Sequence, residues 1–402
     1  MKKVDHTIAV IGIGTGGILS LSHLCTYLPS NWKVVSIYDS DISILGVGES
    51  AVPKIPTNFA YGLGFNFVRD AEKLNATMKM GTRWLDWRKE EFNNPIPAGS
   101  YALHFDNDML SSFALKRLAQ RWSEKFHIMK GNVQSLENSL DKVKVKVNGK
   151  DHFFDYVVDC RGFPDSYADY TMLDLPLNYA LVTWIKKPIN LSPDWTSHLA
   201  HKNGWMFGIP LRDKYSWGYM FNDNITSRDS ALKDMCSMLK LEKDNIPLKE
   251  YSFVPYHANK MIEGRIIKNG NRFLFYEPME GLSGNYYSLV NEYAIDYIRN
   301  ESSEDECNRK MSEDLKGLNV FLSFAYHGGS IYDTKFWKMA QKMTAQSLKD
   351  NDWWYDIKSH YQEHKKDPYL SLPGWPWPGV NWYMLDMGFR YKYFTESFNQ
   401  GF

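Results

Sequence analysis

Cysteine is scarce in this chain of 402 residues. Its four cysteines lie far apart and form no C-x-x-C pair, so we expect reduced, mostly buried thiols rather than a disulfide framework or a zinc site. The eleven histidines, including His327, also lack the spacing of metal ligands. The sequence therefore predicts no metal site.

Long apolar runs and blocks of like charge are equally rare. No stretch of 18 residues is free of polar interruption, which argues against a membrane span. Lys plus Arg and Asp plus Glu both number 47, so neither a nucleic-acid surface nor an anionic membrane partner is expected. Asp5 and His6 interrupt the apolar stretch after Lys2 and Lys3, which therefore does not match a secretory signal. We expect a cytoplasmic enzyme of one large domain or two joined ones.

A glycine-rich turn near the N-terminus is the first feature that points to a function. It follows a short apolar β-type run at residues 8–11 and precedes a helical pattern at residues 18–28. This order is the context of the G-x-G-x-x-G dinucleotide fingerprint. There, Gly12 allows a tight turn, Gly14 the close approach of a pyrophosphate, and Gly17 the packing of helix on strand. The complete turn is Gly12, Ile13, Gly14, Thr15, Gly16 and Gly17.

An acidic residue follows at the distance that dinucleotide sites require. The next apolar run, residues 34–38, ends at Asp39, about 20 residues after Gly17. A carboxylate at that position binds the adenosine ribose hydroxyls. The phosphates would lie at the helix N-terminus, where free N–H groups and the helix dipole favour anions. We therefore expect dinucleotide binding rather than a chance cluster of glycines.

A second landmark lies in the middle of the chain. A hairpin pattern at residues 143–147, with Asn148-Gly149 as its turn, leads into a strand that ends at Asp159 and a glycine turn at Gly162. Similar turns close over the cofactor in flavoproteins of the two-domain monooxygenase type. A plain β-turn after a buried strand is the alternative.

Four further motifs resemble those of flavin-dependent halogenases of the tryptophan-halogenase type. V-G-E-S-A-V-P at residues 47–53 is similar to the segment that wraps the flavin ring. Residues 77–87 look like the segment with the family's active-site lysine, which maps onto Lys79. W-M-F-G-I-P at residues 205–210 is similar to the W-x-W-x-I-P motif, and E-P-M-E at residues 277–280 resembles E-P-L-E. The resemblance extends from the N-terminus to about Trp337, and more loosely to Phe389.

The resemblance implies an α/β fold with a discontinuous FAD-binding, Rossmann-like domain of the two-domain monooxygenase type. That domain would comprise residues 1–110, 150–175 and 260–300. Residues 176–259 would form a β-rich substrate subdomain, and residues 301–402 a helical, aromatic-rich C-terminal part. Aromatic residues make up 15% of the chain, and aromatic side chains suit the wall of a substrate pocket for a planar ring.

The resemblance also implies roles for individual residues. Lys79 and Glu280 would be catalytic, and the main-chain N–H groups of Leu282 and Ser283 would bind the halide. The cofactor residues would be Gly12, Gly14, Thr15, Gly16, Gly17, Asp39, Gly48, Glu49, Ser50, Ala51 and Asp159. The tunnel wall and the substrate pocket would contain Trp205, Phe207, Ile209, Pro210, Trp375, Trp377 and Trp382.

Several positions depart from the family pattern. Phe207 replaces the second tryptophan of W-x-W-x-I-P, and Gly281-Leu282-Ser283 replaces the usual Ser-Thr-Gly. The G-x-A turn that the family has before this region is absent, so Glu277 is the alternative to Glu280 as catalytic carboxylate. Fewer residues separate Lys79 from Glu280 than in typical members.

The implied reaction is halogenation of an electron-rich aromatic small molecule with FADH2 and oxygen. Hypohalous acid would be guided to Lys79, which could hydrogen-bond it or become a haloamine. Only one dinucleotide fingerprint is visible, so a separate NAD(P)H-dependent reductase would supply the FADH2. Chloride, bromide or iodide remain open as halides, and no oligomeric state is predicted. The alternatives are a flavin-dependent aromatic hydroxylase and a nucleotide-binding protein without catalysis.

Overall fold

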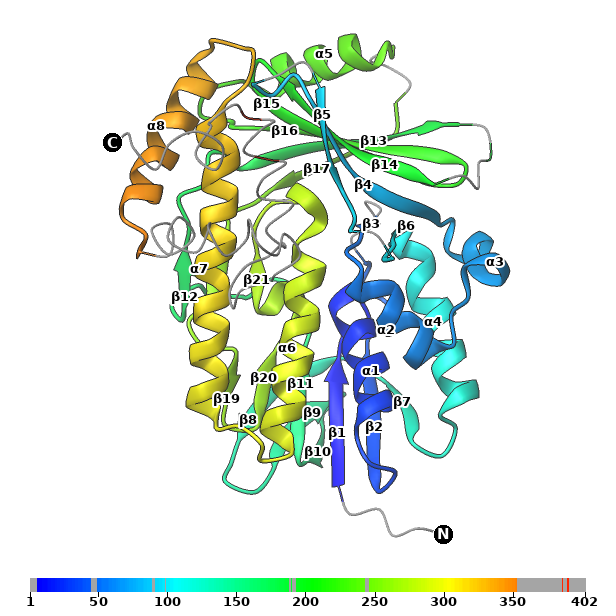
Figure 1. Cartoon of the computed structure of the whole chain (residues 1–402). Coiled ribbons are helices and arrows are strands. Elements are labelled where there is room, and N and C mark those ends of the chain that lie inside the picture. Colours follow the sequence, from blue (N-terminus) through cyan, green and yellow to red (C-terminus); the bar gives the residue numbers. More distant parts are fainter. Residues whose placement is uncertain are drawn as a thin grey trace.

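The computed structural model describes residues 6–44, 49–88, 91–97, 99–187, 189, 193–242, 246–352, 385 and 389. Two large sheets organise the chain, and they lie toward opposite ends of the molecule (Figure 1). None of the helices in these ranges is both long and apolar enough to cross a membrane.

The first sheet has six strands and contains the N-terminal strand at its centre. Its strand order is β19 (Ile262–Glu263), β20 (Ile266–Lys268), β11 (Tyr156–Asp159), β1 (His6–Ile11), β2 (Trp32–Tyr38) and β7 (Phe126–Lys130). Every pair except β19 with β20 is parallel. The strand, glycine turn and helix predicted near the N-terminus are confirmed, because β1 leads into α1 (Thr15–Tyr27).

Burial on both faces explains the apolar character of β1. Ile8 and Val10 pack in the main hydrophobic core together with Ile18 and other residues of α1. Ala9 and Ile11 point to the opposite face and pack in a smaller core with residues of the hairpin. A strand covered on both faces is typical of a central parallel strand.

The hairpin itself belongs to a small three-stranded sheet. Its strands are β8 (Val133–Asn138), β9 (Val143–Val147) and β10 (Lys150–Phe154). Asn148 and Gly149 both have positive φ, at 49° and 79°, which is the geometry favoured in two-residue hairpin turns. The predicted hairpin is therefore confirmed. A second small sheet joins β12 (Tyr170–Met172), β18 (Tyr256–Ala258) and β21 (Leu274–Phe275).

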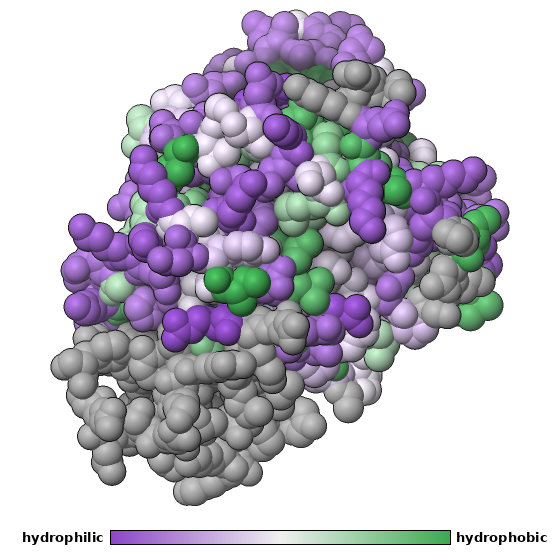
Figure 2. Space-filling view, turned by 90° about the horizontal axis from the view of Figure 1, so that it is seen from above, coloured by the Kyte–Doolittle hydropathy of each residue, from purple (hydrophilic) through white to green (hydrophobic). Residues whose placement is uncertain are grey.

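The second large sheet has nine strands. Its order is β17 (Leu248–Ser252), β13 (Tyr179–Lys186), β16 (Lys214–Phe221), β15 (Gly204–Pro210), β14 (Asp194–His201), β4 (Thr77–Leu85), β6 (Ala102–Phe105) and β3 (Glu49–Ser50), with β5 (Glu91–Pro95) paired to β4. Figure 2 views the end of the molecule that carries this sheet, where hydrophobic side chains form small groups between hydrophilic ones.

Strands from two distant parts of the chain meet in this second sheet. β14 pairs in parallel with β4, so residues 49–105 and 179–252 share one set of ladder hydrogen bonds. Strands β3 to β6 fall within residues 1–110, the first part of the expected FAD-binding domain, but they pair in the nine-stranded sheet and not in the six-stranded one. The pairing joins segments more than a hundred residues apart, and local periodicity carries no information about it.

Helices cover both sheets and connect them. α1 packs beside α2 (Lys54–Leu63), α4 (Asn107–Arg121) and α6 (Ser283–Ile298), while α5 (Arg228–Leu239) covers the second sheet. Short helical turns are α3 (Phe67–Asp70), η1 (Ala71–Leu74), η3 (Gly270–Arg272) and η4 (Met279–Gly281). The long α7 (Glu304–Gly328) runs past both sheets and packs on α8 (Lys335–Lys349) (Figure 1).

The close packing at the glycine turn leads to a stability prediction. A Cβ at Gly17 would lie 2.1 Å from the carbonyl oxygen of Gly12, whereas a Cβ at Gly14 would meet nothing within 4 Å. We expect Gly17→Ala to lower the free energy of unfolding by about 1–3 kcal/mol, since main chain would have to shift. The measurement is denaturant unfolding. The control is Gly14→Ser, which places a preferred N-cap residue in open space and should leave the stability unchanged.

Candidate functional site

The glycine turn at the start of α1 offers an open, uncapped helix N-terminus. Gly12 has a φ of 98°, and a Cβ there would lie 2.4 Å from the Cys160 carbonyl oxygen, so the turn is pressed against the end of β11. Gly14 is the N-cap and, being glycine, has no side chain with which to cap the helix. Open space at Gly14 beside unpaired helix N–H groups fits a pyrophosphate.

Two acidic residues lie at the same end of the six-stranded sheet. Asp39 directly follows β2 and is half-buried, and one of its oxygens accepts a hydrogen bond from Asn132 at 3.3 Å. Asp159 ends β11, next to β1, and is buried. Its carboxylate binds Arg161 through Nε at 2.9 Å and a terminal nitrogen at 2.8 Å. The fold thus brings both predicted carboxylates to the glycine turn, but Asp159 already has a protein partner.

Residues 49–51 connect this turn to the second sheet. The Glu49 carboxylate accepts a hydrogen bond from the Thr15 hydroxyl at 2.9 Å, and burial raises the pKa of Glu49 to about 7. The Ala51 carbonyl, two residues later, accepts a hydrogen bond from Nζ of Lys79 at 3.1 Å. The segment therefore contacts the nucleotide-type turn and the candidate catalytic lysine at once. The Gly48 of this motif lies outside the described residues.

Lys79 lies on β4, an interior strand of the second sheet, and is fully buried. Its Nζ makes two hydrogen bonds, to the carbonyl oxygens of Ala51 at 3.1 Å and of Glu280 at 3.3 Å. Burial lowers the pKa of Lys79 to about 8, and the charge of Glu280 opposes this shift. An isolated lysine would ordinarily face solvent, so this burial marks Lys79 as unusual.

The Glu280 carboxylate is held by three donors from two neighbouring strands. Thr82 donates to Oε2 at 2.5 Å, while Trp84 and Asn94 donate to Oε1 at 3.0 and 3.2 Å. Burial raises the pKa of Glu280, and the charge of Lys79 and these three hydrogen bonds counteract it. Three donors leave one acceptor position on the carboxylate.

The main chain at Glu280 has an uncommon conformation. Its φ of 58° is in the left-handed region, and the next residue, Gly281, has a φ of 70°. A Cβ at Gly281 would lie 1.8 Å from the Ser50 carbonyl oxygen, so only glycine fits there. The N–H of Glu280 donates to Nε2 of His198 at 3.3 Å. The E-P-M-E loop is thus pressed directly onto the segment of residues 49–51.

Glu277, the alternative carboxylate, has different surroundings. Its Oε2 accepts a hydrogen bond from the Tyr326 hydroxyl at 2.8 Å, and that hydroxyl accepts one from Nε1 of Trp205 at 2.9 Å. Its Oε1 is buried and has no hydrogen-bond partner among the described residues. Burial raises the pKa of Glu277 to about 8, which keeps the carboxyl group protonated at neutral pH. Glu280 is therefore the better candidate for an ionised carboxylate beside Lys79.

Four of the predicted wall and pocket residues, Trp205, Phe207, Ile209 and Pro210, lie on β15 and are buried. Trp205 packs against His198 with a centroid distance of 4.8 Å, and its register partner on β14 is Ala200. The Phe207 ring covers Gly218 of β16, where a Cβ would lie 2.1 Å from the ring. Pro210 accepts a hydrogen bond from the Thr77 hydroxyl through its carbonyl. Ile209 is 4% exposed and belongs to the main core.

A cluster of aromatic rings surrounds Trp205 and includes Trp84, whose Nε1 donates to the Glu280 carboxylate. It joins β4, the loop after it and the C-terminal helices, and every ring in it is largely buried. Its members are Trp84, Trp87, Phe92, Trp205, Tyr326, Trp337 and Phe389. Trp375, Trp377 and Trp382, which we expected in the substrate pocket, lie outside the described residues.

A chain of buried hydroxyls and one imidazole lies behind Lys79. Thr77 donates to the Pro210 carbonyl at 2.6 Å, so its 2.9 Å contact with Nδ1 of His104 requires a proton on that nitrogen. Nε2 of His104 then accepts from Thr196 at 2.8 Å, and Thr196 lies 2.7 Å from the Ser50 hydroxyl. Burial, with the charge of Lys79, holds the pKa of His104 well below its usual value. This neutral chain connects the strands that carry Ser50 and Lys79.

The two candidate halide residues lie where α6 begins. Leu282 is the N-cap and is 2% exposed, and Ser283 is the first helical residue. The side chain of Leu282 makes no capping hydrogen bond to this helix. Among the described residues, no group of three or more potential metal ligands occurs.

The fold thus brings most of the predicted site residues together, and it adds several that sequence reasoning missed. Thr82, Trp84, Asn94 and His198 contact Glu280 directly. Thr82 and Trp84 share one strand with Lys79, but only the pairing with β5 and β14 puts Asn94 and His198 beside them. No sequence signal identified these contacts.

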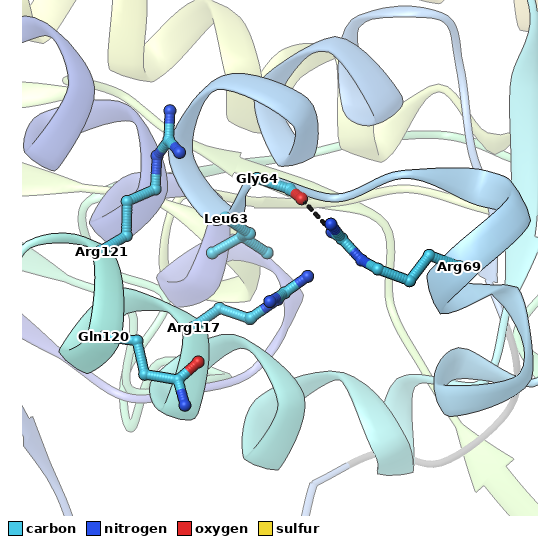
Figure 3. Close-up of a pocket in the computed structure, with 6 residues that line it drawn as sticks. All are labelled: Leu63, Gly64, Arg69, Arg117, Gln120 and Arg121. Atoms are coloured by element: carbon cyan, nitrogen blue, oxygen red, sulfur yellow. Dashed lines mark hydrogen bonds between the residues drawn. The ribbon is translucent and has the colours of Figure 1, made fainter.

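A surface hollow of about 250 Å³ between α2 and α4 is separate from this site. Figure 3 shows its arginines, with Arg69 donating to the Gly64 carbonyl. Arg69 and Arg117 both bind the buried Asp70 carboxylate, and Arg121 lies over the Trp122 ring at 5.6 Å. Because these three arginines already contact Asp70 or Trp122, we interpret the hollow as a gap in the packing between the helices.

Comparison with known proteins relates this geometry to one family. A family model described as tryptophan halogenase matches residues 7–96 and 89–367. The tryptophan 7-halogenase RebH of Lentzea aerocolonigenes is 23% identical over 432 residues, covering 85% of this chain and 79% of the relative. The tryptophan 6-halogenase ThaL of Streptomyces albogriseolus is 21% identical over 443 residues, covering 87% of this chain and 82% of the relative.

Solved structures have the same fold. Tar14, a tryptophan C-6 flavin-dependent halogenase from taromycin biosynthesis, superposes with a TM-score of 0.82 at 17% identity, covering 96% of this chain and 90% of its own. BrvH, a flavin-dependent halogenase from Brevundimonas sp. BAL3, gives a TM-score of 0.78 at 17% identity, with coverage of 96% and 90%.

The surroundings of Glu277 predict a distinct pH dependence of stability. Its raised pKa means that the folded protein retains a proton between about pH 4.5 and 8 that the unfolded chain has lost. The wild type should therefore lose stability as pH rises through this window, and Glu277→Gln should not incur that loss. The stability difference should grow by at most about 1.4 kcal/mol per pH unit. Denaturant unfolding from pH 5 to 8 measures it. Glu72→Gln, at an exposed position, is the control.

Proposed function

The chain belongs to the tryptophan halogenase family, whose model matches most of its length, and we propose that Lys79 and Glu280 are its catalytic pair. It is a flavin-dependent halogenase that acts on aromatic substrates, and the hydroxylase alternative is not favoured. The observation that carries the proposal is the buried contact between the two residues. Nζ of Lys79 reaches the Glu280 carbonyl at 3.3 Å.

FAD is the flavin that the N-terminal turn would hold. The open space at Gly14 and the uncapped start of α1 would take the pyrophosphate, and Asp39 would bind the ribose hydroxyls. Residues 49–51 would lie along the flavin, because they touch both Thr15 and Lys79. When bound in its reduced form, the flavin supplies hypohalous acid from oxygen and halide. The N–H of Ser283, at the start of α6, would be the main-chain donor for that halide, because the N–H of Leu282 already donates to the Met279 carbonyl at 3.4 Å.

The geometry at Nζ of Lys79 defines how it would act. Two of its positions donate to carbonyl oxygens, which can only accept, so one tetrahedral position remains. Below about pH 8 that position carries an N–H, which can hydrogen-bond hypohalous acid and orient it. Above that pH it carries a lone pair, which could attack the halogen. We propose the first role, since the protonated form predominates at neutral pH.

Glu280 would serve as the counter-charge and the proton acceptor. Its carboxylate has one free acceptor position after Thr82, Trp84 and Asn94 are counted. Electrophilic halogenation leaves a proton on the attacked ring carbon, and an ionised carboxylate nearby can remove it. The three donors hold the carboxylate in place and, with the charge of Lys79, oppose the rise in its pKa that burial causes.

The substrate class is inferred from the aromatic cluster around Trp205 and from the chemistry of halogenation. Aromatic walls around Trp205 suit a planar ring, and electron-rich rings such as phenols, anilines and indoles react fastest with a weak electrophile. We propose neutral arenes of this kind as substrates. A single dinucleotide-type turn suggests that a separate NAD(P)H-dependent reductase supplies the FADH2.

The central test is replacement of Lys79. Lys79→Met keeps the apolar stem, and we expect it to abolish halogenation of a panel of phenols and indoles with reduced FAD, oxygen and bromide. Oxygen consumption and FAD binding should persist. In the wild type the rate should fall above about pH 8, because the donating proton is lost. Halogenated mass, measured against pH, checks both. Full activity of Lys79→Met would remove the lysine from the mechanism, and a rate that rises through pH 8 would favour the amine as nucleophile.

Cofactor binding is tested at the glycine turn. Gly14→Val puts a branched side chain into the open space at the helix N-terminus, and we expect it to prevent FAD binding. Asp39→Ala should weaken binding by about 1–3 kcal/mol, the usual penalty when a hydrogen bond to a charged partner is lost. Quenching of FAD fluorescence measures both, and circular dichroism confirms the fold. Unchanged quenching in both variants would place the cofactor elsewhere.

A further inference from the structure

His198 is a buried histidine on β14 whose surroundings have not been used in the reaction so far. Its imidazole lies between two indole rings, with centroid distances of 4.7 Å to Trp84 and 4.8 Å to Trp205. Its Nε2 is 3.3 Å from the main-chain nitrogen of Glu280. One side chain therefore contacts the wall tryptophan and the candidate catalytic loop.

The donor and acceptor roles in this contact are determined by chemistry. The main-chain N–H of Glu280 can only donate, so Nε2 of His198 must be the acceptor. A neutral imidazole that accepts at Nε2 carries its proton on Nδ1. Burial and the charge of Lys79 hold the pKa of His198 well below its usual value, which agrees with a neutral ring.

The accepted hydrogen bond comes from a residue in an unfavourable backbone conformation. Glu280 has a φ of 58°, which residues with a Cβ rarely adopt. This conformation turns its carbonyl toward Lys79 while its carboxylate reaches Thr82 on the same strand. A glycine would relieve the strain but would remove the carboxylate. An acceptor at Nε2 of His198 compensates for the strain without replacing Glu280.

We propose that His198 is a positioning residue for the halogenation step. As a neutral acceptor at Nε2, it holds the main chain of Glu280 in the left-handed conformation that places Lys79 and the carboxylate together. It acts through Glu280 and does not itself touch the oxidant. This inference rests on the proposed roles of Lys79 and Glu280.

The test compares two replacements of the same ring. His198→Phe keeps an aromatic ring between Trp84 and Trp205 but cannot accept a hydrogen bond. His198→Gln places an amide oxygen at about the distance of Nε2 and restores an acceptor. We measure melting temperature, FAD binding, free hypohalous acid trapped by a scavenger, and kcat and KM for arene halogenation.

We expect His198→Phe to fold, to bind FAD and to form hypohalous acid, but to lose at least about tenfold in kcat with little change in KM. His198→Gln should recover most of this loss. Normal kcat in His198→Phe would overturn the proposal. Equal losses in both variants would also overturn it, because ring packing rather than the acceptor would then matter.

A spectroscopic measurement keeps the proposal testable if His198→Phe does not fold. In protein with ¹⁵N-labelled histidine, the resonance pair that disappears in His198→Gln should show a protonated Nδ1 and an unprotonated Nε2 from pH 6 to 8. A protonated Nε2 would overturn the proposal. Lys79→Met, assayed alongside, separates the two ideas: full halogenation by that variant defeats the proposed catalytic pair, whatever the result at His198.

Discussion

The site depends on the burial of one ammonium group among carbonyl oxygens. Nζ of Lys79 is removed from water and has two carbonyls as partners, one from residue 51 and one from Glu280. A buried charge is costly unless its donors are satisfied, so the two segments that provide these carbonyls must be held closely. The contact between Gly281 and the Ser50 carbonyl, and the hydrogen bond from Glu280 to His198, meet that requirement.

The two sheets carry different parts of the candidate site. The six-stranded sheet presents the open glycine turn, while the nine-stranded sheet carries Lys79, the Glu280 donors and Trp205. Residues 49–51 form the bridge, since β3 belongs to the second sheet and Glu49 contacts Thr15 of α1. Residues 49–51 therefore contact both the glycine turn and Lys79.

Two carboxyl groups three positions apart have different environments: burial raises the pKa of both, but only Glu280 has a cation and three donors that oppose the rise. Glu280 accepts hydrogen bonds from three donors and lies beside a cation, which favours the ionised form. Glu277 accepts one hydrogen bond, from Tyr326, and its other oxygen has no hydrogen-bond partner among the described residues, so burial favours the neutral form. The sequence motif contains both residues and does not distinguish them. Their neighbours come from β4, β5 and α7, and these decide which one can act as a base.

Local patterns in the sequence were sufficient for the β1–turn–α1 unit, the hairpin at Asn148-Gly149 and the family to which the chain belongs, because each depends on neighbouring residues or on short motifs. They also located Lys79 and Glu280 as candidates. The parallel pairing of β14 with β4, which places His198 beside Glu280, could not be predicted. Pairing between segments a hundred residues apart is decided by the packing of the whole sheet. The sequence by itself determined which residues were available for the chemistry, and only the tertiary structure decided their protonation and their partners, since both depend on burial and on contacts between distant segments.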